Sequence, residues 1–295
     1  MTTTIYESAW DLLDKQLHRE MKLVWNPSGP VILAVDSEKG GVGKSALSAG
    51  LVAVMAANGK RVLAVDLDPR ASLTEQLDAT EGEFSVNDLL YVDTAADPDE
   101  LPELSGLAAQ ALRDAGEEWG PNVKVLAADR ALGNREHDNT PNLEHRLRVS
   151  LEGVAEEFDL VVIDFPPRPG GKLVASGLLA ATHVLYPGTL TEDGYVGIAD
   201  ALRTRRFMDQ ANPRKLIDVG MVRNIVDRKT RVAQLIEDKF REDFKDRVLP
   251  VVVPKRVIRE EARLARVPIT AAQGKDAQEL VNAYTGVLNF VGKAA

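Results

Sequence analysis

The 295-residue sequence contains no cysteine. This absence excludes disulfides, thiolate metal sites and thiol nucleophiles together. The chain also lacks a run of about 18 consecutive apolar residues, which a membrane-spanning helix would need. Its first 22 residues show no basic segment followed by an apolar run, so they do not resemble a secretory signal. These absences predict a cytoplasmic globular protein, and the length favours one large domain with a sizeable core.

Basic residues are fewer than acidic ones, 36 against 45, and the net charge of -9 by itself argues against a nucleic-acid partner. The charges are unevenly distributed, however. Residues 75–120 contain thirteen acids and one base, whereas residues 201–231 contain nine bases and three acids. Because the Debye length is about 8 Å at physiological salt, well-separated surfaces of opposite charge act independently. A basic surface can therefore bind a polyanion despite the negative total.

Short runs of β-favouring residues alternate with longer helical patterns along the chain. This alternation predicts an α/β fold, with a doubly wound, mostly parallel sheet covered by helices on both faces. The expected strands are residues 31–36, 61–66, 123–128, 160–164, 182–187, 217–222 and 247–253. The expected helices are residues 44–58, 143–157, 192–210, 231–244 and 276–291.

We expect a single domain over residues 29–295, preceded by an N-terminal amphipathic helical extension, residues 1–28. Apolar residues recur at helical spacing in the extension: Ile5, Ala9, Leu12, Leu13, Leu17 and Met21. Its polar face mixes acids with bases, which favours packing on its own domain or on a second subunit over membrane anchoring. Within the domain, residues 93–120 are interpreted as an acidic surface insertion, a solvated helix and loop.

The stretch SEKGGVGKSA, residues 37–46, joins the first expected strand to the first expected helix. Its glycines allow backbone N–H groups to turn inward, and the helix N-terminus adds partial positive charge, so the stretch predicts a phosphate-binding loop. Lys44 would reach the β and γ phosphates, and the Ser45 hydroxyl would bind Mg²⁺. The usual motif begins with glycine where this chain has Glu38, and Lys39 adds a second lysine.

Carboxylates follow two other expected strands at the sheet edge where open α/β sheets bind ligands. Asp66 and Asp68 end the second strand, and their spacing fits one carboxylate in the metal sphere and one directed at a water. Asp164 ends the fourth strand, where such proteins place the acid that holds Mg²⁺. The predicted metal-binding residues are therefore Ser45, Asp66 and Asp164.

The segments KGGVGKS, DLDPRASLT and DFPPRPGG, in this order, resemble the deviant Walker-type ATPases of the ParA/MinD family. The resemblance covers nearly the whole chain from residue 31. It implies a homodimer that forms on ATP binding, with Mg²⁺, in which Lys39 crosses into the partner's site. It also implies that Asp68 positions the attacking water, so that the catalytic residues are Lys39, Lys44 and Asp68.

The same resemblance implies the nucleotide-binding residues and marks two departures. Ala46 stands where the family usually has a hydroxyl at the α phosphate, and Arg70 stands where a glutamine is common. The implied nucleotide-binding residues are Lys39, Gly40, Gly41, Val42, Gly43, Lys44, Ser45 and Ala46, with Asn224, Pro254 and Arg256 placed against adenine.

Several branches of the family can be distinguished by the presence or absence of particular residues. Iron–sulfur relatives need cysteines, and tyrosine-kinase relatives carry a tyrosine cluster where this tail has only Tyr284. MinD-like proteins end in a basic amphipathic membrane helix. Here the terminal apolar stripe is better interpreted as core packing, and Glu38 also favours ParA, in which glutamine is frequent at that position. The stripe is Leu280, Val281, Tyr284, Val287, Leu288 and Val291.

The DNA-partition branch implies basic residues on the later loops and helices. The candidates are Arg228, Lys229, Arg231, Lys255, Arg259, Arg263 and Arg266. If residues 254–266 are helical, Arg259, Arg263 and Arg266 share one face. A solvated face paired with Glu260 and Glu261 is the alternative.

We therefore expect a ParA-like ATPase that hydrolyses ATP to ADP and phosphate. Its dimers would bind DNA nonspecifically, mainly through phosphates. They would be nucleoid-associated, would not bind membrane, and would be released by a ParB-like activating partner. Two alternatives stay open. One is a MinD-like ATPase at the membrane surface, and the other is an amidoligase-like synthetase that phosphorylates a small molecule, although such enzymes normally lack the extra loop lysine.

Overall fold

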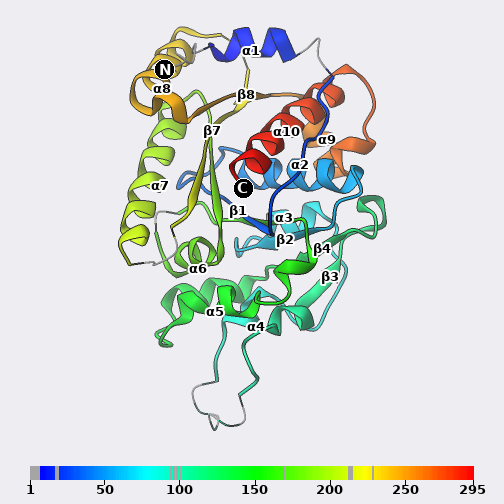
Figure 1. Ribbon diagram of the computed structural model, residues 1–295, viewed down its shortest axis with the longest axis vertical. Helices are drawn as coiled ribbons and strands as arrows, with labels where there is room; N and C mark the ends of the chain where they lie inside the picture. Colours follow the sequence, from blue (N-terminus) through cyan, green and yellow to red (C-terminus); the bar gives the residue numbers. More distant parts are fainter. Residues whose placement is uncertain are drawn as a thin grey trace.

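The computed structural model describes residues 7–16, 20–93, 95, 97, 99, 101–168, 170–211, 215–227 and 229–295. In these parts of the chain, eight strands form one sheet in the order β3-β4-β2-β5-β1-β6-β7-β8 (Figure 1). The strands are β1 (Val31–Val35), β2 (Val62–Asp66), β3 (Leu112–Asp114), β4 (Val123–Leu126), β5 (Leu160–Asp164), β6 (His183–Gly188), β7 (Ile217–Val226) and β8 (Val248–Pro254).

All neighbouring strands pair in parallel except β3, which pairs antiparallel to β4 at one edge. The central strand β5 lies between β1 and β2, and Asp164 is in register with both Val35 and Asp66. The carboxyl ends of these three strands therefore meet at one point of the sheet edge, as the sequence predicts.

Helices cover both faces of the sheet, and the sheet separates the apolar core into two layers (Figure 1). One core layer lies beneath α2, α3, α9 and α10, and the other beneath α1 and α4 to α8. The helices are α1 (Ala9–Gln16), α2 (Lys44–Ala57), α3 (Ser72–Gln76), α4 (Val86–Leu90), α5 (Leu143–Ser150), α6 (Lys172–Ala180), α7 (Glu192–Ala211), α8 (Arg231–Phe244), α9 (Val257–Leu264) and α10 (Lys275–Ala294).

The predicted doubly wound, mostly parallel α/β fold is confirmed. One predicted helix is too long, because α5 ends at Ser150 and the chain then turns through Gly153 at a φ of +79°. Such a φ favours glycine and ends regular helix. The short strand β3 and the helix α6 have no counterpart among the elements expected from the sequence.

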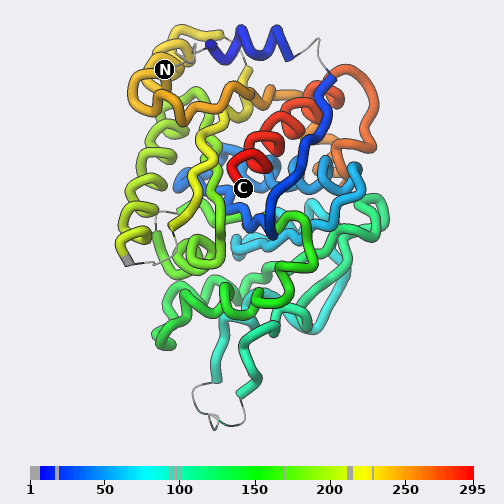
Figure 2. The backbone as a smooth tube through the Cα atoms, in the orientation of Figure 1, coloured from blue at the N-terminus to red at the C-terminus, as the bar shows by residue number. Residues whose placement is uncertain are grey.

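The N-terminal segment packs on its own domain. Ala9 and Leu12 of α1 are buried in the core, and α1 contacts β8 and α10. The following residues cross α10, where the Met21 and Val24 N–H groups donate to Asn282 and Asn289 at 3.2 and 2.7 Å (Figure 2). Two apolar positions of the predicted amphipathic pattern, Ile5 and Leu17, lie outside the described residues.

The predicted acidic insertion, residues 93–120, divides into two parts. Its second part contains a 3₁₀ helix, η2 (Leu107–Ala111), the strand β3 and a second 3₁₀ helix, η3 (Glu117–Trp119). Trp119 is buried there, and its indole N–H donates to the Arg266 carbonyl at 2.9 Å. This part belongs to the edge of the sheet rather than to a solvated loop, whereas residues 101–105 are mostly exposed. The domain boundaries themselves stay a prediction.

The C-terminal apolar stripe packs in the core, as predicted. Leu280, Tyr284, Val287, Leu288 and Val291 of α10 are all buried against α2 and the sheet. Across the described residues we find no helix long and apolar enough to cross a membrane.

Candidate functional site

The glycine-rich loop joins β1 to α2 and adopts a conformation that needs glycine at two positions. Gly41 and Gly43 have φ values of +78° and +79°. A Cβ at Gly43 would also lie 2.9 Å from the Asn224 amide nitrogen. That amide donates to the Val42 and Gly43 carbonyls at 2.7 and 3.2 Å, so the end of β7 holds the loop in place.

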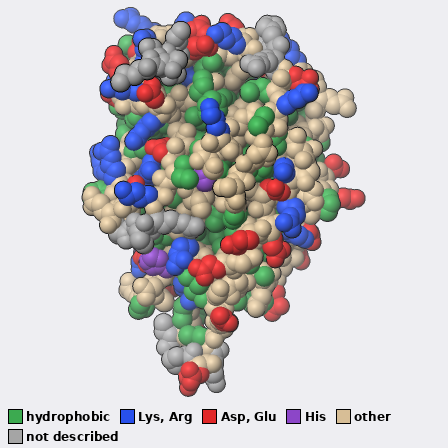
Figure 3. All heavy atoms as spheres, viewed as in Figure 1, with side chains coloured by type: hydrophobic (Ala, Val, Ile, Leu, Met, Phe, Trp, Pro, Cys, Tyr) green, Lys and Arg blue, Asp and Glu red, His purple; other side chains and the backbone are tan. Residues whose placement is uncertain are grey.

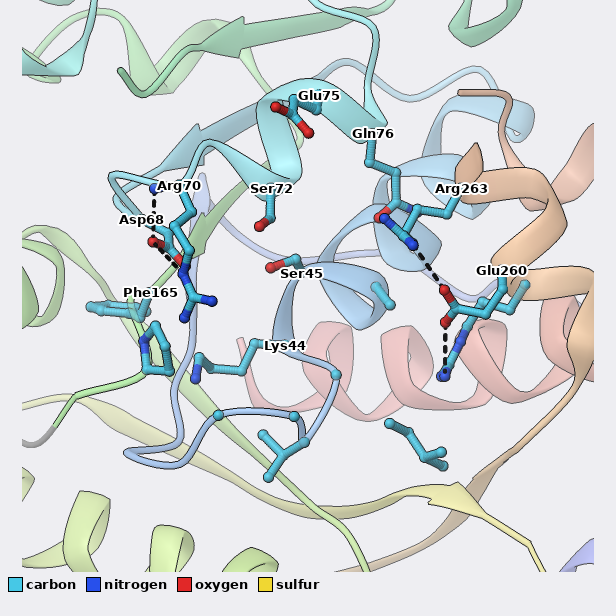
Figure 4. Close-up of a pocket in the computed structure, with 18 of the residues that line it drawn as sticks. Lys44, Ser45, Asp68, Arg70, Ser72, Glu75, Gln76, Phe165, Glu260 and Arg263 are labelled. Atoms are coloured by element: carbon cyan, nitrogen blue, oxygen red, sulfur yellow. Dashed lines mark hydrogen bonds and ion pairs between the residues drawn. The ribbon is translucent and has the colours of Figure 1, made fainter. Parts of the chain in front are cut away.

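A cavity of about 500 Å³ opens in front of this loop (Figure 4). Its volume lies in the range of small-ligand sites. One wall comes from the β2–α3 connection and α3, the opposite wall from α9, and the floor from the loop and the start of α2. The lining residues are Gly40, Gly41, Val42, Gly43, Lys44, Ser45, Ala46, Asp68, Arg70, Ser72, Glu75, Gln76, Phe165, Pro167, Ile225, Arg259, Glu260, Arg263, Leu264 and Arg266.

Lys44 is buried beneath the cavity, and its ammonium group closes the loop on itself. It donates to the Ser37 and Lys39 carbonyls at 2.7 and 3.1 Å. Burial lowers its pKa, and the nearby carboxylates of Asp164, Asp36 and Asp68 oppose that shift. The ammonium group therefore lies at the floor of an N–H-rich loop, where an anionic oxygen would be stabilised.

Asp164 is fully buried at the end of β5, directly behind the start of α2. The Ser48 hydroxyl donates to Oδ1 at 3.4 Å, whereas Oδ2 has no hydrogen-bond partner among the described residues. Burial and repulsion from Asp66 raise the pKa of Asp164, and the nearby Ser45 hydroxyl opposes the shift. The orphaned oxygen beside a serine hydroxyl fits a hydrated Mg²⁺ held partly by phosphate oxygens. The described residues contain no cluster of three acidic or histidine side chains that would hold a metal ion alone.

Asp66 is fully buried, and donors of its own connection occupy both of its oxygens. Oδ1 accepts from the Asp68 N–H at 3.0 Å, and Oδ2 accepts from the N–H and hydroxyl of Thr74 at 2.8 and 2.9 Å. These bonds fix the β2–α3 connection and orient Asp68, which lines the cavity. The structure thus gives Asp66 a positioning contact, and metal binding by Asp66 stays a prediction.

Glu38 and Lys39 point away from the cavity toward α7. Buried Glu38 accepts a hydrogen bond from the Thr204 hydroxyl, and its own N–H donates to the Gly197 carbonyl at 3.3 Å. The Lys39 ammonium lies 3.4 Å from the exposed carboxylate of Asp193. Lys39 is therefore the one predicted catalytic residue that does not line the cavity of its own subunit.

The predicted adenine contacts are not brought to the cavity wall. Asn224 holds the loop, as described above, and buried Pro254 ends β8. Arg256 pairs with Glu279 at 2.6 Å and with Asp276 at 3.4 Å. Ile225, which the sequence analysis did not select, lines the cavity beside Gly43 with a φ of +55°. A β-branched residue seldom has this φ, but no sequence signal marks such a residue in advance.

The prediction that Arg259, Arg263 and Arg266 share one helix face is correct for Arg259 and Arg263, which belong to α9 and both line the cavity, and wrong for Arg266, which lines it from beyond the helix. Helix α9 ends at Leu264, and Arg266 follows it with a φ of +57° and pairs with Asp78 at 2.9 Å. Arg259 is buried and lines the cavity, where its Nε and Nη1 lack hydrogen-bond partners among the described residues. Arg263 pairs with Glu260 at 2.9 Å, in agreement with the alternative interpretation of a paired, solvated face.

Of the remaining basic candidates, Lys229 and Lys255 lie on the neighbouring loops after β7 and β8, and Arg231 begins α8. The Lys255 N–H donates to the Val226 carbonyl at 2.8 Å, which holds these loops side by side. Lys229, Arg231 and Lys255 are exposed, and Lys255 pairs with Asp227 at 3.1 Å. Arg228 lies outside the described residues.

Charge is unevenly distributed over the visible surface. Figure 3 shows acidic side chains gathered toward the side of β3 and β4, and more basic ones along α7 and α8. Several bases of residues 201–231 are internally paired, however, including Arg205 with Asp218 and buried Arg223 with Glu237. The available cationic surface is therefore smaller than the composition of this segment suggests, and it includes the exposed Lys229, Arg231 and Lys255.

Other cavity residues also escaped the sequence analysis. Phe165 and Pro167 follow β5, and Ser72, Glu75 and Gln76 come from α3. The first two belong to the DFPPRPGG segment, so their position after a strand was a usable signal. The α3 residues become neighbours of the loop only through the tertiary fold.

Comparison with known proteins agrees with this geometry. The family model AAA_31, described as an AAA domain, matches residues 31–217. The chromosome-partitioning ATPase Soj of Thermus thermophilus is 30% identical over 242 residues, covering 80% of this chain and 84% of that protein.

Solved structures share the fold. An ATP complex of a Cyanothece McdA variant is 17% identical, with a TM-score of 0.75 over 90% of this chain and 97% of that one. The Mycobacterium smegmatis cobyrinic acid a,c-diamide synthase, bound to an ATP analogue and magnesium, is 26% identical, with a TM-score of 0.66 over 87% and 91%. The chain thus belongs to the AAA_31 family of AAA domains and to the ParA/MinD group of P-loop ATPases.

Proposed function

We propose that this protein is an ATP-dependent dimerising ATPase of DNA partition, which binds DNA nonspecifically in its ATP state. The observation that carries the proposal is the convergence of the glycine loop, Lys44, Ser45 and Asp68 on one cavity, with Asp164 buried directly behind the start of α2. Its membership of the family supports ATP as the ligand, and the partition ATPase among its relatives supports the process.

The loop N–H groups and Lys44 would bind the β and γ phosphates, and Ser45 and Asp164 would hold hydrated Mg²⁺. When bound, Mg²⁺ neutralises charge that develops on the phosphate oxygens. Asp68 would orient the attacking water, whose oxygen bonds to the γ-phosphorus as the bond to the β–γ bridging oxygen breaks. ADP leaves with that electron pair, and the proton lost by the water goes to phosphate or solvent.

The position of Lys39 supports a second subunit. In its own subunit the ammonium group pairs with Asp193, and this exposed pair is weak enough to exchange for a phosphate. The partner subunit's Lys39 would then reach the γ phosphate, so that ATP binding and dimerisation become coupled. The dimer would also present two copies of the exposed basic loops around Lys229, Arg231 and Lys255.

Doubling the phosphate contacts gives a switch for DNA binding. A dimer contacts twice as many phosphates as a monomer and therefore binds DNA more tightly. The logarithm of its affinity also falls more steeply with log salt, because the slope is proportional to the number of phosphates contacted. Hydrolysis, stimulated by a ParB-like partner, would release the protein from DNA. The protein would then be cytoplasmic and nucleoid-associated.

The decisive experiment is a DNA mobility assay over a series of salt concentrations with ATP, ADP or no nucleotide. We expect retardation of unrelated DNA sequences only with ATP, and its loss as salt increases. Lys44→Ala is the nucleotide control, and Lys229→Ala with Arg231→Ala should flatten the salt dependence without changing ATP affinity. Retardation that is equal with and without ATP would contradict the proposal.

The MinD-like alternative is disfavoured by the buried stripe of α10, and ATP-dependent sedimentation with liposomes would be needed to support it. The synthetase alternative has a specific observation in its favour, the 26% identity to cobyrinic acid a,c-diamide synthase. Stimulation of ATP turnover by a small carboxylic acid, in the absence of DNA, would select that function instead.

A further inference from the structure

Two cationic side chains face the same space above the phosphate loop. Figure 4 shows Arg70 extending from the β2–α3 connection, past Asp68, toward the end of Lys44. Both residues line the cavity, and repulsion from the guanidinium group adds to burial in lowering the pKa of Lys44. Like charges that converge across a cavity are stabilised when an anion lies between them.

The backbone of Arg70 is held in place, whereas its side chain is mostly exposed. Its N–H donates to the Asp68 Oδ1 at 3.0 Å, which ties residue 70 to the site. Its Nε lies 3.8 Å from the same oxygen, and the side chain is 72% exposed. An exposed ion pair of this length contributes little to stability, so the guanidinium group can exchange Asp68 for a phosphate.

We propose that Arg70 is a further catalytic residue, which contacts the terminal phosphate of ATP bound in its own subunit. The inference rests on the proposed function, because it requires ATP in this cavity. As the water oxygen bonds to the γ-phosphorus and the bond to ADP breaks, the guanidinium group stabilises charge on the transferred phosphoryl oxygens. The site then has two cations from its own chain, Lys44 and Arg70, in addition to the partner subunit's Lys39.

This arrangement makes a specific distinction between nucleotides. ADP lacks the phosphate that Arg70 contacts, so Arg70 should discriminate ATP from ADP. Lys44 would also contact the β phosphate, which both nucleotides possess, and its loss should weaken the binding of both. A side chain that merely supported the fold would affect both nucleotides equally.

The test uses the purified full chain with Mg²⁺ and compares Arg70→Gln and Arg70→Lys with the parent. We expect Arg70→Gln to slow single-turnover ATP hydrolysis by about 100-fold. It should weaken ATP binding several-fold and leave ADP binding unchanged, and Arg70→Lys should restore part of the rate. Arg148→Gln is the matched control, because Arg148 of α5 also forms a partly exposed ion pair, with Glu152, and does not line this cavity. It should hydrolyse ATP at the parent rate.

Hydrolysis by Arg70→Gln at the parent rate would overturn this inference, as would equal weakening of ATP and ADP. Both results would leave the proposed function intact, provided that Lys44→Ala abolishes nucleotide binding. Failure of the parent protein itself to bind or hydrolyse ATP would refute both proposals. Thermal melting of each variant without nucleotide, expected to match the parent because Arg70 is exposed, distinguishes a local effect from misfolding.

Discussion

Asp66 and Asp68 are two positions apart, yet their surroundings give them separate tasks. Asp66 is enclosed by N–H and hydroxyl donors of its own connection, whereas Asp68 keeps an oxygen toward the cavity. A carboxylate committed to backbone N–H groups holds a loop, and one at a cavity wall can orient a ligand. Substitution of Asp66 and substitution of Asp68 should therefore have different consequences, although the residue type is the same.

We expect Asp68→Ala to retain ATP binding and lose ATP hydrolysis, because the loop and Lys44 stay intact while the water-orienting oxygen is removed. Lys44→Ala should instead abolish ATP binding. Nucleotide titration and single-turnover hydrolysis separate the two variants. Hydrolysis by Asp68→Ala at the parent rate would show that another group orients the water.

Motif spacing predicted the position of Lys44, Ser45, Asp68 and Asp164 because each residue lies at a strand end or helix start. Burial of Arg259 was not predictable in this way. Its spacing from Arg263 fits a common helix face, and both residues line the cavity, but only Arg259 is buried there and Arg263 is exposed. The direction of a side chain relative to a neighbouring element depends on tertiary packing, which spacing alone does not contain.

At the scale of elements, α1 links two distant parts of the chain. Its Ala9 N–H donates to Glu237 of α8 at 2.7 Å, and Glu237 also pairs with Arg223 of β7 at 2.6 Å. Leu12 is buried in the same core layer. The helix thus covers a buried ion pair that would otherwise face water.

We expect Leu12→Ala to lower the free energy of unfolding by about 2–3 kcal/mol, because it removes a buried side chain and leaves a cavity. Leu13→Ala is the matched control, since Leu13 is only partly buried, and should cost less. Denaturant unfolding at low protein concentration measures both. Equal effects of the two variants would indicate that α1 does not pack on its own domain in solution.

The strands and helices differ in how well hydrophobic periodicity could predict them from the sequence. The apolar runs of β1, β2 and β5 are long enough to identify buried parallel strands from the sequence. β3 has three residues and an exposed member, so its strand conformation depends on pairing with β4 rather than on its own pattern. Helix α6 begins after two glycines. It was not predicted, because the glycine- and proline-rich segment before it indicates a loop.

At the scale of the whole molecule, buried acids under the loop couple stability to pH. Burial raises the pKa of Asp36 from 3.8 to about 7. Between these values the folded protein keeps a proton that the unfolded chain has lost, so the free energy of unfolding falls as pH rises through this window. The stabilising contribution is complete below the lower value and is lost above about pH 7.

We therefore expect Asp36→Asn to become more stable than the parent as pH rises from 5 to 8, by up to about 1.4 kcal/mol for each pH unit inside the window. Thermal or urea unfolding without nucleotide at each pH gives the difference. Glu81→Gln, which replaces an exposed acid, is the control and should show no such trend. A constant difference between Asp36→Asn and the parent at every pH would contradict the assignment.

Lys39 points away from the cavity of its own subunit, so its role in a dimer can be tested by mixing variants. If it acts across the interface, two defective variants should complement one another. In a mixed dimer of Lys39→Ala and Asp68→Ala, the Lys39→Ala subunit keeps its Asp68 and receives the intact lysine of its neighbour. One complete site is restored, and the other lacks both the aspartate and the lysine.

An equimolar mixture should therefore recover about a quarter of the parent rate, since half of the dimers are mixed and each has one complete site of two. Each variant alone should stay nearly inactive, and a mixture of Lys44→Ala with Asp68→Ala serves as the control without recovery, because neither protomer keeps a complete site. If Lys39 acted within its own subunit, the first mixture would also fail, since one site would lack the lysine and the other the aspartate. Recovery thus requires the ammonium group to cross between chains, which links nucleotide binding to dimerisation.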